Sequence, residues 1–394
     1  MDEKFVFLDI KIGSNSIGRI VIELLWEKAP KTCKNFQVLC SEGIKIKNQV
    51  FTYQDNCFHR IIKTFMIQAG DIVYGKDGQN CTKSAEIGKG GCSIYAKEDE
   101  LVSTESPDGI RCYGNFADEN LGELPEPFMV AMANMGTENS NSSQFFITTQ
   151  SAPHLNEKHS IFGKVLHGKS VVRTVERSEV DSDGFPKEPV FIEKCGQWQI
   201  SMGIPVFNAS NDPIGGDVYE EFPEDDLNFD QESAEKAFEA SATMKNSGSL
   251  LFKQKNFQGA LFKYKKALRY VNEFIPEPDV SQEYNLKFTD LKAKLYLNIS
   301  LVYLQLQQFE DSLTYTTFLL EMPESSRFDK AKAHYRSGNC HFAKKRFDKA
   351  LAAYKSCKEL NSEDEVVDKK IADTQARLDQ AKENTKKSLA KFFG

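Results

Sequence analysis

The spacing of apolar residues changes near residue 200, and this change constrains the fold more than any other feature of the sequence. Before that point, short branched and aromatic runs such as residues 5–12 and 16–24 are separated by Gly, Pro, Asn and Asp. From about Glu232 the apolar residues recur at helical spacing almost to the end. A strand pattern and a helix pattern in separate halves indicate two domains. The length of 394 residues agrees, because one hydrophobic core of that size is unusual.

The N-terminal part, placed at residues 1–200, has the pattern of a closed antiparallel β-barrel with two helices. Residues 5–12 and 16–24 flank a Gly-Ser-Asn turn and predict a hairpin. Pro30 suits the first turn of a helix that runs to about Cys40. Further short apolar runs follow in the rest of this part, and many short strands with few helices are typical of a barrel.

The C-terminal part contains an internal repeat in which a small residue is followed by aromatic residues. The small residue is Gly248 in the first unit, Ser300 in the second and Gly338 in the third. Small residues where helices cross allow the close packing that stacked helix pairs need. Three units are the usual minimum for a stable stack. Residues 230–363 are therefore predicted as a three-repeat, all-α domain whose units resemble tetratricopeptide repeats, and residues 364–394 as a helix that caps it.

Residues 201–229, between the two parts, have the composition of a linker. The segment is rich in Gly and Pro, and from Asp217 to Asp230 it is acidic without a basic residue. Such a composition is typical of a solvated spacer.

Composition narrows the class of protein. The formal net charge is -7, so we expect no general binding to nucleic acid or to an anionic membrane surface. The start lacks a secretory signal and no run has the length of a membrane span, so a cytoplasmic location is expected. Nine cysteines without a Cys-x-x-Cys pair favour reduced thiols. A redox pair of Cys33 with Cys40, or of Cys40 with Cys195, stays open beside ordinary packing.

Residues 58–71, Phe-His-Arg-Ile-Ile-Lys-Thr-Phe-Met-Ile-Gln-Ala-Gly-Asp, form the most informative run of the chain. Met-Ala-Asn at 132–134, Ser-Gln-Phe-Phe-Ile at 143–147 and His-Ser-Ile-Phe-Gly-Lys at 159–164 follow in order. Together these segments resemble the active-site signature of the cyclophilins, and the resemblance extends over about residues 5–199. It implies peptidyl-prolyl cis-trans isomerase activity, at a level that could be low.

Isomerisation of an X-Pro bond explains the residue types in these segments. The rotation faces a barrier of about 18–20 kcal/mol from amide resonance. Since no bond is made or broken, we expect neither a metal nor a cofactor. The resemblance implies that Arg60 donates toward the prolyl nitrogen in the twisted state, and that Gln68 and His59 belong to the same catalytic group. A fixed, always charged guanidinium suits this task.

The same resemblance implies a substrate pocket that receives X-Pro segments of client proteins. Its residues are Ile62, Phe65, Met66, Ala133, Asn134, Met135, Phe146, His154, Leu155 and His159. The sequence departs from the family at several of these places and beside them. Lys63-Thr64 replaces the usual Pro-Gly and could loosen the turn there, Met135 replaces a small residue, and His154 replaces a tryptophan that binds cyclosporin. Weak cyclosporin binding is therefore expected, and an acidic insertion at 96–113 adds to the rim.

The helical repeats resemble tetratricopeptide modules that hold the C-terminal acidic peptide of a heat-shock chaperone in a cationic clamp. The matching positions are Lys245, Ser249, Asn298, Lys332 and Arg336, with Ser249 where asparagine is usual. As a whole the chain resembles large tetratricopeptide-containing cyclophilins of fungal type. The expected partner is the 90-kDa heat-shock protein, with the 70-kDa protein as a second candidate. The alternative is a catalytically weak scaffold that holds clients or regulates the chaperone ATPase through the repeats.

Overall fold

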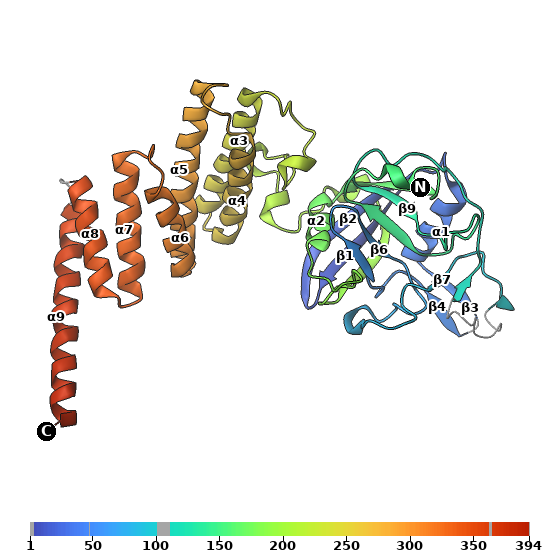
Figure 1. Ribbon diagram of the computed structural model, residues 1–394, viewed down its shortest axis with the longest axis horizontal. Coiled ribbons are helices and arrows are strands. Elements are labelled where there is room, and N and C mark those ends of the chain that lie inside the picture. The colour runs from blue at the N-terminus through green and yellow to red at the C-terminus, as the bar shows by residue number, and fades with distance from the viewer. Residues whose placement is uncertain (1–3, 47, 101–110, 362–364, 394) are drawn as a thin grey trace. The chain divides into compact units, whose positions relative to one another are not determined.

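The computed structural model describes residues 4–46, 48–100, 111–361 and 365–393, and it divides into two compact units. The first unit comprises residues 1–207 and contains the strands (Figure 1). The second comprises residues 208–394 and is helical. In the described part of the chain, no helix combines the length and the apolar character that crossing a membrane requires.

The first unit is built on one eight-stranded antiparallel sheet with the order β12-β1-β2-β11-β9-β10-β6-β5. Two smaller sheets pair β3 with β4 and, in parallel, β7 with β8. Helices α1 (Pro30–Cys40) and α2 (Lys169–Glu176) pack against the large sheet. The strands are β1 (Phe5–Ile12), β2 (Asn15–Leu24), β3 (Ile44–Ile46), β4 (Gln49–Phe51), β5 (Arg60–Ile62), β6 (Met66–Ala69), β7 (Gly90–Cys92), β8 (Arg111–Tyr113), β9 (Met129–Met132), β10 (Phe145–Thr148), β11 (Ile161–His167) and β12 (Val190–Trp198).

The large sheet curls until the segment before β5 meets β12. The Phe58 N–H donates to the Val190 carbonyl over 2.8 Å, and the Ile192 N–H donates to the Asn56 carbonyl over 2.9 Å. A single bridge between Cys57 and Phe191 lies at this junction. The predicted antiparallel barrel is thus confirmed, with closure through this bridge in place of a full strand pair.

Aromatic side chains fill the inside of the barrel. Phe36 of α1 is fully buried, and its ring centroid lies 4.9 Å from that of Tyr53, 5.0 Å from that of Phe145 and 4.9 Å from that of Phe162. Such contacts bury a large apolar area and favour tilted or edge-on geometry. The helix predicted to begin at Pro30 therefore packs against β10 and β11 through Phe36.

Two pairs of cysteines lie close together in this unit. Cys57 and Cys81 form a disulfide with a Cα–Cα distance of 6.5 Å. The expectation that every thiol is reduced is wrong at this pair, because the fold joins segments whose spacing in the sequence gives no signal. Cys40 and Cys195 are free thiols, and burial together with the neighbouring Cys195 raises the pKa of Cys40.

The second unit is a stack of antiparallel helix pairs followed by one long helix. The helices are α3 (Ala234–Lys253), α4 (Phe257–Phe274), α5 (Gln282–Gln305), α6 (Phe309–Leu320), α7 (Arg327–Ala343), α8 (Phe347–Leu360) and α9 (Glu365–Phe393). Pairing runs α3 with α4, α5 with α6 and α7 with α8, and α9 packs on α8 (Figure 1).

The small residues of the repeat lie where paired helices cross. A Cβ atom on Gly248 would come within 2.7 Å of the Tyr264 ring, and one on Gly338 within 2.4 Å of the Tyr354 ring. Ser300 is fully buried and accepts a 2.8 Å hydrogen bond from the Ser312 hydroxyl at its carbonyl. Glycine is needed at the first and third crossings because a side chain would displace the facing tyrosine.

The acidic segment before α3 is not a solvated spacer, which corrects the expectation drawn from its composition. Asp217 is buried and pairs with two fully buried ammonium groups, Lys263 at 2.5 Å and Lys266 at 2.8 Å. Asp226 is buried as well and accepts a 2.5 Å hydrogen bond from the Tyr270 hydroxyl. Carboxylates of this segment are thus the counter-ions of lysines on α4, and the segment belongs to the helical unit.

Candidate functional site

Three neighbouring strands place the predicted catalytic residues side by side. Arg60 on β5 lies opposite Gln68 on β6, and Gln68 lies opposite Phe146 on β10. Residues directly opposite one another on antiparallel strands point to the same face of the sheet. The Arg60 side chain is exposed on this face, whereas only 4% of Phe146 is exposed. A charged group, an amide and an aromatic wall therefore share one surface.

Beside them lies a compact apolar cluster that unites most of the predicted proline pocket. Met66 and Phe146 are buried in it, and Ile62, Phe65, Ala133 and Leu155 are partly exposed at its edge. Partly exposed apolar groups around a buried floor form a surface that can receive a proline ring.

Two histidines line the rim of this cluster. The ring centroid of the exposed His154 lies 4.9 Å from that of Phe65. The His159 ring stands edge-on to Phe146 at 5.2 Å, and its Nδ1 lies 3.0 Å from the Met132 carbonyl oxygen. Burial lowers the pKa of His159, so its ring is neutral near pH 7. His159 therefore presents a neutral aromatic ring to the rim.

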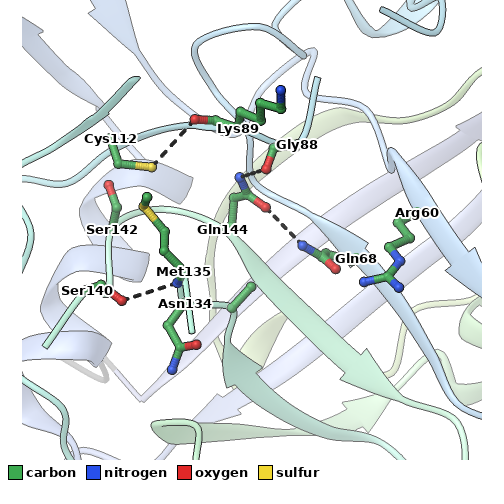
Figure 2. A pocket seen from close by; sticks show the side chains of 11 residues that line it. Arg60, Gln68, Gly88, Lys89, Cys112, Asn134, Met135, Ser140, Ser142 and Gln144 are labelled. Atoms are coloured by element: carbon green, nitrogen blue, oxygen red, sulfur yellow. Dashed lines mark hydrogen bonds between the residues drawn. The ribbon is translucent and has the colours of Figure 1, made fainter. Parts of the chain in front are cut away.

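A second cavity of about 320 Å³ opens next to Arg60 (Figure 2). The predicted residues Arg60, Gln68, Ala133 and Asn134 line it, and so does Met135, which is 43% exposed. The other lining residues are Gly88, Lys89, Cys112, Ser140, Ser142 and Gln144. The bulky Met135 thus narrows this second cavity. The described part of the rim insertion contributes Cys112, whereas residues 101–110 lie outside the described residues.

Gln144 is a site residue that the sequence reasoning missed. The Gln68 Nε2 donates to its Oε1 over 2.9 Å, and its own Nε2 donates to the Gly88 carbonyl over 2.8 Å (Figure 2). The same Nε2 also donates to the Gly90 carbonyl over 2.8 Å. This chain of bonds fixes the orientation of Gln68 beside Arg60. The signal was present, because Gln144 belongs to the 143–147 segment that carried the resemblance.

The Asn134 side chain already has hydrogen-bond partners in its own loop and in the segment before β11. Its Nδ2 donates to the Lys158 carbonyl over 2.8 Å, and its Oδ1 accepts from the Gly136 N–H over 3.1 Å. Both polar atoms of the Asn134 amide thus have a partner within the protein.

His59 lies in the interior, although the resemblance grouped it with the catalytic residues. It is 7% exposed, it does not line the cavity beside Arg60, and neither ring nitrogen has a hydrogen-bond partner among the described residues. Burial lowers its pKa to about 4. The ring is neutral near pH 7 and lies in the protein interior, directly before the strand that begins at Arg60.

The Lys63-Thr64 turn after β5 is held firmly, contrary to the expected loosening. Thr64 has a left-handed backbone with φ of 59°, and its N–H donates to the Glu176 carboxylate over 2.8 Å. Glu176 in turn pairs with Arg173 at 3.0 Å, and Arg173 donates to the Thr149 carbonyl over 2.8 Å. Helix α2 thus anchors this turn, which compensates for an unfavourable conformation of a branched residue.

In the helical unit, the five predicted clamp residues lie on the first helix of each pair. Lys245 and Ser249 are on α3, Asn298 is on α5, and Lys332 and Arg336 are on α7. Lys332 and Arg336 line a common groove, whose volume is about 450 Å³. The Ser249 hydroxyl is engaged with the Lys245 carbonyl and the Tyr264 hydroxyl, over 3.1 Å and 3.2 Å. The structure therefore brings together the α7 part of the predicted clamp.

Comparison with known proteins agrees with this geometry. Residues 7–197 match the family model described as cyclophilin type peptidyl-prolyl cis-trans isomerase/CLD, and residues 331–364 match the tetratricopeptide repeat. The chain is 52% identical to the peptidyl-prolyl cis-trans isomerase CYP7 of Saccharomyces cerevisiae, over the full length of both chains. It belongs to the cyclophilin family.

A second relative also matches almost the whole chain. The cyclophilin is 34% identical to the peptidyl-prolyl cis-trans isomerase D of Kluyveromyces lactis, over 98% of each chain. The cyclophilin domain and the repeat therefore identify this chain as a peptidyl-prolyl cis-trans isomerase with a tetratricopeptide module for protein–protein interaction.

Proposed function

We propose that this cyclophilin is a cytoplasmic co-chaperone that docks the C-terminal acidic peptide of the 90-kDa heat-shock protein through its repeats. Docking would bring the isomerase to X-Pro segments of client proteins held by the chaperone. The observation that carries the proposal is Lys332, an exposed cation at a groove lined by the described residues of α5, α7, α8 and α9. An extended peptide that ends in carboxylates matches such a groove by charge.

For the isomerase we assign the chemistry to the row Arg60, Gln68 and Phe146. The proline ring would rest on the cluster around Phe146 and Met66 while the preceding carbonyl turns. Arg60 would then donate to the prolyl nitrogen as it becomes pyramidal, an interaction that strengthens only in the twisted state. Gln68, oriented by Gln144, would hold the substrate backbone during the rotation.

The catalytic assignment is tested with Arg60→Ala. Loss of a charge-assisted hydrogen bond, worth roughly 1.5–3 kcal/mol, should lower kcat/KM for a short X-Pro peptide by at least tenfold. Lys34→Ala, which removes an exposed cation of α1 in the same unit, is the control. Unchanged turnover in Arg60→Ala would refute the assignment.

The docking assignment is tested with Lys332→Ala. We expect the variant to lose binding to the acidic peptide while isomerase activity stays at the wild-type level. Lys330→Ala is the matched control, because Lys330 is on the same helix but does not line the groove. A pull-down in which Lys332→Ala still retains the 90-kDa protein would contradict the clamp. The same pull-down with the 70-kDa protein would show whether that protein is a second partner.

A second candidate function is a weakly active scaffold that holds clients or regulates the chaperone ATPase. It is favoured by Met135, which narrows the cavity beside Arg60, and by the exposed His154 at the rim. His154 offers less apolar area than a tryptophan, so cyclosporin binding should be weak. Turnover at background level in the wild type, with peptide docking intact, would favour the scaffold over the enzyme.

A further inference from the structure

A buried ion pair on helix α2 contacts two loops that carry residues of the apolar cluster, and the isomerase chemistry assigned above makes no use of it. The side chains of Arg173 and Glu176 are only 10% and 8% exposed, and their charged groups lie 3.0 Å apart. Burying such a pair adds little net stability, because removing both charges from water offsets most of their attraction. The role of the pair therefore follows from what else the two side chains contact.

Glu176 holds the turn between β5 and β6. Its carboxylate accepts the Thr64 N–H over 2.8 Å, and Thr64 has a left-handed backbone that branched residues rarely adopt. The next residue is Phe65, whose side chain belongs to the apolar cluster. The Phe65 N–H donates to the Ile62 carbonyl over 3.1 Å, which closes the turn. The carboxylate thus fixes the backbone directly before Phe65.

Arg173 holds the chain directly after β10. Its Nη1 donates to the Thr149 carbonyl over 2.8 Å, and the Thr149 N–H donates in turn to the Phe65 carbonyl over 2.9 Å. Thr149 lies between strand β10, which carries Phe146, and the short helical turn that carries Leu155. The ion pair therefore links the backbone on both sides of Phe65 to the end of β10.

We propose that Arg173 and Glu176 are positioning residues of the isomerase, which hold the Phe65 ring at the edge of the apolar cluster that receives the proline ring. The inference rests on the pocket proposed above and adds two residues that act through the turn and not on the substrate. An apolar contact with the proline ring is made in the ground state and in the twisted state alike. Its loss should therefore raise KM and leave kcat nearly unchanged.

The test measures KM and kcat of the full chain with a short X-Pro peptide at varied peptide concentration. Glu176→Ala releases the Thr64 N–H and should raise KM about fivefold, with kcat within about twofold of wild type. Glu179→Ala is the matched control, because Glu179 follows α2 and its exposed carboxylate pairs with Lys187 at 3.4 Å. Both constants should stay at the wild-type level in this control.

Two further variants separate positioning from a loss of stability. Glu176→Gln keeps an oxygen that accepts the Thr64 N–H, so KM should return close to the wild-type value. It also leaves the buried Arg173 without a carboxylate, so the domain should unfold at a lower urea concentration. Phe65→Leu removes the ring, and in this background Glu176→Ala should raise KM no further, because both changes act on the same contact.

The position of the Phe65 ring can also be followed without an activity assay. Its centroid lies 4.9 Å from that of the exposed His154 ring, and the two planes are tilted by 44°. The Phe65 ring current therefore shifts the proton NMR signals of the His154 ring, which are identified by their loss in His154→Gln. Glu176→Ala should move these signals toward their positions in Phe65→Leu, whereas Glu179→Ala should not.

Glu176→Ala leaves Arg173 as an unpaired buried charge, so a second variant covers the case in which it does not fold. Arg173→Met combined with Glu176→Gln replaces the pair by neutral side chains of similar size, a change that buried pairs often tolerate. The double variant keeps the acceptor for the Thr64 N–H but loses the donor to the Thr149 carbonyl. KM should therefore rise in the double variant as well.

Three results would overturn the inference. A wild-type KM in folded Glu176→Ala, or in the double variant, would mean that the pair does not position the ring. Additive effects of Glu176→Ala and Phe65→Leu would mean that the carboxylate acts through other contacts. If Phe65→Leu alone keeps the KM and kcat of wild type, the pocket proposed above fails first and this inference fails with it.

Discussion

The buried imidazole of His59 makes the stability of the cyclophilin domain depend on pH in a defined window. Its pKa is lowered from 6.5 to about 4, chiefly by burial, with Arg60 acting in the same direction and Asp71 opposing. Between these pH values the unfolded chain binds a proton at this ring and the folded domain does not. The free energy of unfolding is therefore not reduced by His59 above pH 6.5, and it falls as the pH decreases toward 4.

The expected magnitude follows from the width of that window. Each pH unit between 6.5 and 4 removes about 1.4 kcal/mol from the free energy of unfolding, and the whole window removes about 3 kcal/mol. His159 and His167 of the same domain also have a lowered pKa through burial and contribute in the same direction. The His59 contribution is therefore measured as the difference between wild type and His59→Gln at each pH.

The two tryptophans of the chain provide the assay. Trp26 and Trp198 both lie in the first unit, so tryptophan fluorescence during urea unfolding reports on this domain alone. The stability advantage of wild type over His59→Gln should shrink by about 3 kcal/mol between pH 7 and pH 4. His154→Gln removes an exposed imidazole and serves as the control. A difference between wild type and His59→Gln that stays constant with pH would refute a buried, neutral His59.

Two further variants test contacts described above. Asp217→Ala removes the carboxylate that pairs with the buried Lys263 and Lys266, which should lower the free energy of unfolding by about 3–5 kcal/mol. The melting temperature followed by circular dichroism at 222 nm should fall. An unchanged melting curve would contradict the buried cluster. Thr64→Gly relieves a left-handed backbone on a branched residue and should stabilise the cyclophilin domain by about 1 kcal/mol. If Thr64→Gly unfolds at a lower urea concentration than wild type, as followed by tryptophan fluorescence, the turn carries no such strain.

Local patterns made much of the active site predictable. Arg60, Gln68 and Phe146 belong to short segments whose order matched a family, and the strands place them in one row. The interior position of His59 also follows from the alternation of side chains in extended backbone, because the next residue, Arg60, begins β5 and is exposed.

Contacts between distant segments could not be predicted in the same way. Cys57 and Cys81 are 24 residues apart and meet only when the barrel closes. Arg336 matched a clamp position, yet its guanidinium bonds to α5 because α5 and α7 pack closely enough to offer the Ser300 hydroxyl. The residue type limits which interactions a side chain can form, whereas the neighbouring residues in the fold determine which partner it actually binds.

By itself, the sequence determined the two-domain division, the barrel, the helical repeats and the family, since periodicity and short motifs act over a few neighbouring residues. Only the tertiary structure shows whether the acidic segment before α3 is solvated or buried. Its composition indicated a solvated spacer, but Asp217 pairs with Lys263, 46 residues later, in a fully buried cluster. Composition gives the charge of a segment, and only the fold shows whether water or a buried lysine balances that charge.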